Sequence, residues 1–267
     1  MWVRILTEPP DPPDFHRIDN VLGGAQLLRR LALDKDITVP LPRDTQPAPS
    51  RLLAVDLDGT LVNHGGSLDP RDVEALKSAV ASGVAVTIAT GRLSSSSLWI
   101  ARHLGLGTPI ICADGAALVC ANTGEALEET AIEAATVIAI VDILRSRALC
   151  PYVFAHDGAH GETLGEAFAT YVMSWTTRLT FHPQLSDAPT FSGKPGVLVA
   201  LGMGDRAKVE TARAMIGGSH GKRLEVSAFC LGGSDWALRI QRRGSSKGAC
   251  LARLCGRLGI VREQVAA

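Results

Sequence analysis

Short apolar runs that alternate with helix-like segments are the feature that most constrains the fold of this chain. Three runs, RLLAVD from Arg51, GVAVTIATGR from Gly83 and TPIICADGA from Thr108, each predict a strand that ends in polar residues. Continuous apolar runs of this length are typical of parallel strands that are covered on both faces. Because helix patterns lie between the runs, the sequence predicts an α/β fold with a doubly wound parallel sheet.

Two of the predicted helices carry clear signals at their ends. SLDPRDVEALKSAVASG has Asp69 as the cap, a proline in the first turn and Gly83 as the stop. GSSKGACLARLCGRLGI has Ser245 or Ser246 as the cap and Gly259 as the stop. A further helix, SSSSLWIARHLGLG, is predicted between the second and third strands.

The pattern changes between about Ala131 and Gln241. The helix AIEAATVIAIVDILRS is followed by the strand PYVFAH, a poorly patterned middle, the strand GVLVALGM, the helix RAKVETARAMIGG, and the strands RLEVSAF and WALRIQ. Paired strands with helices between them indicate an α+β unit inserted into the first fold. The expected division is a proline-rich extension at 1–50, a core at 51–130, an inserted unit at 131–240 and the rest of the core at 241–267.

Composition excludes some classes of partner. The chain has 27 Lys and Arg against 27 Asp and Glu, so its net charge gives no attraction to nucleic acid or to an anionic membrane. No apolar run approaches the roughly 20 residues that span a bilayer, and no signal-type segment opens the chain, so we expect a cytoplasmic protein. The six cysteines show no paired spacing and are expected to be free thiols.

Polar residues directly after the strands are the candidates for chemistry, because ligands of open parallel sheets bind at the carboxyl ends of the strands. Asp56 and Asp58 follow the first strand, Thr90 the second and Asp114 the third, while Lys247 begins a later helix. Two carboxylates at one strand end repel each other unless a cation is present. Mg²⁺ accepts one or two carboxylates together with waters and a phosphate.

These residue types together suit phosphoryl transfer. A carboxylate can attack phosphorus while its neighbour moves a proton to and from the oxygens. Thr90 would supply a hydroxyl donor, Lys247 a positive charge, and Gly59 would let backbone N–H groups approach the phosphate.

DLDGTL, TIATGR, ADGA and GSSKGACLARL, in this order, resemble the haloacid dehalogenase superfamily of phosphohydrolases, and in particular its Cof-type members with a large α/β cap. The resemblance covers Leu52 to the C-terminus. It implies a Mg²⁺-dependent phosphatase for small phosphorylated metabolites, such as sugar phosphates or phosphorylated cofactors. It also implies that Asp56 is the nucleophile and a metal ligand, and that Asp58 is the general acid and base, whose backbone carbonyl also binds the metal. Thr90 and Gly91 would bind phosphate with Lys247.

Two positions depart from the family pattern. Asp114 stands where the family usually has asparagine, and its charge would weaken anion binding unless it is protonated or paired. The family also continues into a fourth strand with an acidic Gly-Asp-x-x-Asn-Asp motif, which the 267 residues do not reach, so we expect a core that is incomplete at its C-terminus, with the first strand left as an exposed edge. The alternative hypothesis is therefore a catalytically disabled fragment or pseudoenzyme.

Other patterns are weaker signals. Arg92 is either a surface charge at a helix start or a neighbour of the phosphate. The sequence HDGAH, with His156, Asp157 and His160, predicts a loop of the inserted unit in preference to a metal site on a helix. RRGSSKG lacks the spacing of a nucleotide-binding P-loop. The tryptophans Trp99, Trp175 and Trp236 are predicted to pack inside the core or cap.

Overall fold

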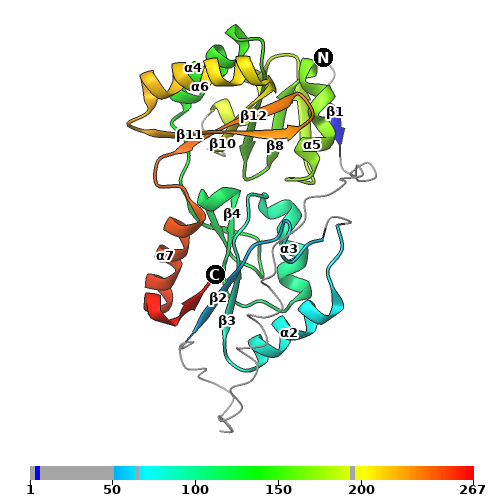
Figure 1. Cartoon of the computed structure of the whole chain (residues 1–267), viewed down its shortest axis with the longest axis vertical. Coiled ribbons are helices and arrows are strands. Elements are labelled where there is room, and N and C mark those ends of the chain that lie inside the picture. Colours follow the sequence, from blue (N-terminus) through cyan, green and yellow to red (C-terminus); the bar gives the residue numbers. More distant parts are fainter. Residues whose placement is uncertain (1–3, 7–50, 64–65, 193–195) are drawn as a thin grey trace.

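The computed structural model describes residues 4–6, 51–63, 66–192 and 196–267 as two units, which we call the core and the cap (Figure 1). The strands of the core are β2 (Leu52–Val55), β3 (Ala85–Ile88), β4 (Ile110–Cys112), β5 (Ala117–Val119), β6 (Ala126–Glu129) and β13 (Val265–Ala266). Its helices are α2 (Pro70–Ala81), α3 (Ser94–His103) and α7 (Lys247–Leu258). The predicted extension at 1–50 lies outside the described residues, except for β1 (Arg4–Leu6).

The core has parallel strands with helices on both faces, and β5 and β6 add an antiparallel part beside β4. Strands β13, β2 and β3 pair in parallel, and a parallel bridge between Ala89 and Ile111 continues the order to β4. Successive strand residues point to opposite faces. Leu53 packs into one hydrophobic cluster with residues of α2 and α3, whereas Leu52 packs into another with residues of α7. This arrangement confirms the predicted doubly wound fold class.

The helix ends follow the sequence signals. Asp69 caps α2 by accepting a hydrogen bond from the Arg71 N–H group. Of the two candidate serines, Ser246 caps α7 by accepting from the Ala249 N–H group at 3.1 Å. Gly259 ends α7 in the left-handed conformation that favours glycine, with φ of 67°.

The cap is a sheet covered by helices on one face. Its strands are β1, β7 (Cys150–Ala155), β8 (Gly158–Glu162), β9 (Leu179–His182), β10 (Val197–Asp205), β11 (Leu224–Gly232) and β12 (Asp235–Arg242), and its helices are α4 (Ala134–Ser146), α5 (Ala169–Met173) and α6 (Arg206–His220). The sheet order is β1-β9-β8-β7-β10-β12-β11. Helices α4 and α6 cover the face away from the core, so the other face of the sheet looks toward the core (Figure 1).

Two expectations need correction. The edge of β2 is not left bare along its whole length, because Val265 and Ala266 pair in parallel with Leu52 and Leu53. Trp99 does not pack inside the core, since half of its surface is exposed. A contact that the sequence does not predict joins the extension to the cap, because β1 pairs antiparallel with β9.

Two findings concern the chain as a whole. All six cysteines, which lie within the described ranges, are free thiols, as predicted. No helix in the part of the chain that the structure describes is long and apolar enough to cross a membrane.

Candidate functional site

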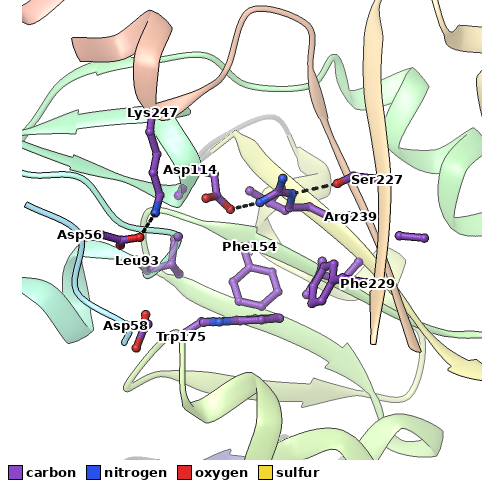
Figure 2. A pocket seen from close by; sticks show the side chains of 15 residues that line it. Asp56, Asp58, Leu93, Asp114, Phe154, Trp175, Ser227, Phe229, Arg239 and Lys247 are labelled. Carbon is purple, nitrogen blue, oxygen red and sulfur yellow. Dashed lines mark hydrogen bonds and ion pairs between the residues drawn. The ribbon is translucent and has the colours of Figure 1, made fainter. Parts of the chain in front are cut away.

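A cavity of about 410 Å³ lies between the carboxyl ends of the core strands and the open face of the cap sheet (Figure 2). The core residues that line it are Asp56, Asp58, Gly91, Leu93, Ala113, Asp114 and Lys247. Loops after three different strands thus converge on one cavity, as expected for ligand sites of open α/β sheets. The volume falls in the range of small-molecule pockets.

Asp56 and Lys247 form the ion pair at the core end of the cavity. Asp56 directly follows β2, and its Oδ1 atom accepts a hydrogen bond of 2.8 Å from the Leu57 N–H group. Its Oδ2 atom lies 2.8 Å from Nζ of Lys247, the first residue of α7. Lys247 is 191 residues away in the chain, so only the closed fold brings this cation to the carboxylate. Both side chains are partly exposed and reachable by a ligand.

Asp58 is held by an arginine at the mouth of the cavity. Nε of Arg92 lies 3.2 Å from each carboxylate oxygen of Asp58. The Asp58 side chain remains 54% exposed, while that of Arg92 is only 17% exposed. Of the two hypotheses for Arg92, the pairing places it beside the site and not on a distant surface.

Gly59 forms part of the tight turn after β2. It adopts φ of 73°, and its own N–H group donates to the Val62 carbonyl at 3.1 Å. The expectation that Gly59 lets neighbouring backbone N–H groups approach a phosphate stays a prediction.

Thr90 and Gly91 end up in different positions relative to the cavity. Thr90 is fully buried, and its Oγ1 atom accepts a hydrogen bond of 3.1 Å from the Arg92 N–H group. Gly91 lines the cavity beside Asp114, and a Cβ atom at this position would lie 3.1 Å from Asp114 Oδ2. The structure thus brings Gly91 to the cavity wall, whereas the Thr90 hydroxyl orders the loop.

Asp114 is paired with a cation from the cap. Its carboxylate accepts a hydrogen bond from Nη1 of Arg239, on β12, and Nε of Arg239 donates to Ser227 Oγ on β11 at 3.3 Å (Figure 2). Asp114 itself has a left-handed backbone, with φ of 52°. The pairing meets the condition under which a carboxylate at this position is compatible with a nearby anion.

A close backbone approach fixes the start of α7 against the loop after β4. Gly115 is buried with φ of 92°, and a Cβ atom there would lie 2.1 Å from the Ser246 carbonyl oxygen and 2.8 Å from the Lys247 nitrogen. Only glycine permits this contact, which sets the position of Lys247 relative to the β4 loop.

A pair of histidines in the cap and a buried cysteine in the core lie outside the cavity. In the cap, the turn His156–Asp157 joins β7 to β8, and the buried His160 on β8 lies 3.0 Å, Nδ1 to Nε2, from His182. HDGAH thus comprises the turn of a β-hairpin and the first residues of β8, so the loop that the sequence predicts is limited to His156 and Asp157. At the end of β4, burial raises the pKa of the Cys112 thiol, which keeps it protonated and unreactive.

The donor chemistry of the cavity fits Mg²⁺. Asp56 and Asp58 offer partly exposed carboxylates, and Mg²⁺ is commonly held by one or two carboxylates with water and substrate phosphate. Within the described ranges no group of three or more His, Cys, Asp or Glu residues could hold a metal ion. Water and phosphate oxygens could join the Asp56 carboxylate and the Asp58 backbone carbonyl, which the family resemblance implies as ligands.

Sequence reasoning missed the cap side of the cavity. Its functional candidates are Phe154, Trp175, Ser227, Phe229 and Arg239. The period of two along β11 and β12 could have shown that Ser227, Phe229 and Arg239 share one face of their sheet. It could not have shown that this face is turned toward Asp114.

Comparisons with known proteins agree with the fold and the motifs. The sequence pattern of the haloacid dehalogenase-like hydrolases matches residues 53–267. The chain is 34% identical over 118 residues to the Bacillus subtilis 5-amino-6-(5-phospho-D-ribitylamino)uracil phosphatase YwtE, a match covering 44% of this chain and 40% of that protein. It is 29% identical over 108 residues to the Escherichia coli pyridoxal phosphate phosphatase YbhA, with 40% of each chain covered.

These matches span about two fifths of the length of the two curated relatives. A solved haloacid dehalogenase-like hydrolase from B. subtilis has the same fold, with a TM-score of 0.66 and 24% identity, over 81% of this chain and 82% of that one. Because the family pattern extends over most of the chain and the cavity gathers the residues of its motifs, the protein belongs to the haloacid dehalogenase-like hydrolase family.

Proposed function

We propose that this protein is a Mg²⁺-dependent phosphatase that hydrolyses small phosphorylated metabolites through an aspartyl-phosphate intermediate. The observation that carries the proposal is the Asp56–Lys247 pair, in a cavity that also holds Asp58 and Gly91. The names of the two curated relatives, which are phosphatases of small phosphorylated compounds, support the same reaction class.

The first half of the reaction transfers the phosphoryl group to the protein. An Asp56 oxygen attacks phosphorus, the bond from phosphorus to the ester oxygen breaks, and the leaving oxygen takes a proton from the Asp58 carboxyl group. Lys247 supplies positive charge beside the transferred group, where negative charge is concentrated. Mg²⁺, held by Asp56 and Asp58, would supply further positive charge at the phosphate oxygens.

The second half regenerates the free carboxylate. Water loses a proton to Asp58 and attacks phosphorus, and the bond from phosphorus to the Asp56 oxygen breaks to release inorganic phosphate. Asp58 is suited to both proton transfers by its position at the exposed mouth of the cavity, where Arg92 orients it. The cap covers the cavity and limits the access of water to the bond.

The test is release of inorganic phosphate from a panel of phosphate monoesters by the purified chain, with and without added Mg²⁺. Asp56→Asn should lower kcat at least about 1,000-fold, because it removes the nucleophile. Asp142→Asn is the matched control, since Asp142 lies on the exposed face of α4 and, among the described residues, forms an ion pair only with Arg145. Retained turnover in Asp56→Asn, or no Mg²⁺-dependent turnover in the wild type, would refute the proposal.

A further inference from the structure

Three aromatic side chains of the cap form one wall of the cavity, which we call the aromatic wall (Figure 2). It consists of Phe154 on β7, Trp175 after α5 and Phe229 on β11. The Trp175 ring centroid lies 5.9 Å from that of Phe154 and 6.1 Å from that of Phe229, with tilted or edge contacts. The wall lines the same cavity as Asp56 and Asp58, so a ligand with its phosphate at Asp56 would have its leaving group in the space that these rings border.

Trp175 is fixed in position by contacts to both units. Its ring packs edge-on against the ring of Tyr171, with 4.9 Å between the two ring centroids. Its backbone carbonyl accepts two hydrogen bonds of 2.8 Å from the core, one from the Leu93 N–H group and one from the Ser96 hydroxyl. The indole is therefore held in place before a ligand arrives, which lowers the entropic cost of binding a ring against it.

Polar groups on the cap side are few. Of the eight cap residues that line the cavity, only Ser227 and Arg239 are polar. Arg239 is already held by Asp114 and Ser227 through Nη1 and Nε, and within the described part of the chain no hydrogen bond is found for its Nη2 atom. The guanidinium thus keeps donor capacity for one or two acceptor atoms of a ligand.

This lining discriminates between classes of leaving group. A sugar carries several hydroxyl groups, and each hydroxyl that is buried without a hydrogen-bond partner weakens binding because its hydration is lost without replacement. A planar ring with one or two acceptor atoms leaves few groups unsatisfied, and its faces match the aromatic side chains. A cavity of about 410 Å³ has room for such a ring together with a phosphate.

We propose that the aromatic wall and Arg239 select phosphate monoesters whose leaving group carries a planar aromatic or heteroaromatic ring, over sugar phosphates. The inference rests on the proposed phosphatase function. Arg239 donates a hydrogen bond to an acceptor atom of the ring, and Asp114 acts as a positioning residue that holds the guanidinium.

The experiment compares kcat/KM for two ring substrates, pyridoxal 5′-phosphate and pyridoxine 5′-phosphate, with that for ribose 5-phosphate and glucose 6-phosphate. The wild type should favour the ring substrates. Stacking of a ring on an aromatic side chain is worth about 1–3 kcal/mol, so Trp175→Leu should lower kcat/KM for them about tenfold or more, with little change for the sugar phosphates. Trp99→Leu is the control, because Trp99 is half exposed and does not line the cavity.

Arg239→Lys tests whether the guanidinium contacts the ligand ring. Asp114→Asn tests whether Asp114 acts by holding that guanidinium in place. Arg239→Lys keeps the charge but loses the fork of donors, so KM for the ring substrates should rise several-fold. Asp114→Asn keeps an acceptor for Arg239 and should retain most of the preference for ring substrates, whereas Asp114→Ala should lose it. Equal loss in both Asp114 variants would contradict the positioning role.

Binding distinguishes failure of this inference from failure of the proposed function. Calorimetric titration of Asp56→Asn with pyridoxine 5′-phosphate and with glucose 6-phosphate measures selection without turnover. Tighter binding of the ring compound, lost in the Asp56→Asn, Trp175→Leu double variant, supports the inference even if the wild type hydrolyses neither compound. Turnover and binding that favour the sugar phosphate would overturn the inference while leaving a phosphatase in place.

Discussion

Replacement of Gly115 by alanine tests whether a backbone contact positions Lys247, the cation of the proposed mechanism. Gly115 has φ of 92°, and a Cβ atom would lie 2.1 Å from the Ser246 carbonyl oxygen and 2.8 Å from the Lys247 nitrogen. Both neighbours are backbone atoms at the start of α7, so no side-chain rotation can relieve the overlap. The start of α7 must move away from the β4 loop, and Lys247 must move with it.

Two costs should lower the free energy of unfolding of the Gly115→Ala variant. A side chain in the left-handed backbone region costs about 1–2 kcal/mol, and forcing apart packed atoms costs typically about 1–3 kcal/mol. Gly115→Ala should therefore lower the free energy of unfolding by about 2–5 kcal/mol, measured by urea unfolding. Since Lys247 would no longer lie 2.8 Å from Asp56, kcat/KM for any phosphate monoester that the wild type hydrolyses should also fall.

Gly83→Ala is the matched control. Gly83 has φ of 83°, but a Cβ atom there meets nothing within 4 Å. This variant should show only the backbone cost of about 1–2 kcal/mol and unchanged kinetics. Equal destabilisation in the two variants, or unchanged kinetics in Gly115→Ala, would refute the reasoning that this contact sets the position of Lys247.

Three further predictions concern single side chains. Lys247→Met should lower kcat/KM about 100-fold or more in the phosphate-release assay while hardly changing the urea midpoint, because the charge acts on a transition state and lies partly in solvent. Ser246→Ala removes the α7 cap and should lower the free energy of unfolding by about 1 kcal/mol, and an unchanged urea midpoint would count against that cap. Burial and the neighbouring His160 lower the pKa of His182 in the folded state, despite opposing carboxylates, so the unfolded chain binds the proton more readily and stability should fall as pH drops below about 6.5. His182→Gln should flatten this decline in urea unfolding between pH 7.5 and 5.5, whereas an unchanged slope would assign it to other groups.

The elements with strong local signals are those that the sequence predicts well. Asp69 and Ser246 begin their helices as capping residues should, and Gly259 ends α7 in a left-handed conformation. The poorly patterned middle of the inserted unit could not be predicted in this way, because β8 and β9 are short and carry no regular apolar period. Their parallel pairing depends on contacts with each other and not on local preference.

The core half of the candidate site could be predicted for a related reason. Asp56, Asp58, Gly91 and Asp114 each follow a strand, and parallel strands bring their carboxyl ends to one edge of the sheet. The phosphate-binding role of Thr90 stays a prediction: its hydroxyl oxygen accepts a hydrogen bond from the Arg92 N–H group, and no motif specifies where the hydroxyl proton points.

The sequence by itself determined the doubly wound core, its helix ends and the set of polar residues at the strand ends, since these follow from periodicity, capping and the direction of parallel strands. Only the tertiary structure decided the partners of those residues: Lys247 beside Asp56, Arg92 beside Asp58, and Arg239 beside Asp114. It also decided which cap face meets the core and therefore which aromatic rings line the cavity. The physical reason is that contacts between distant segments depend on how two packed units meet, and local sequence preferences do not encode that orientation.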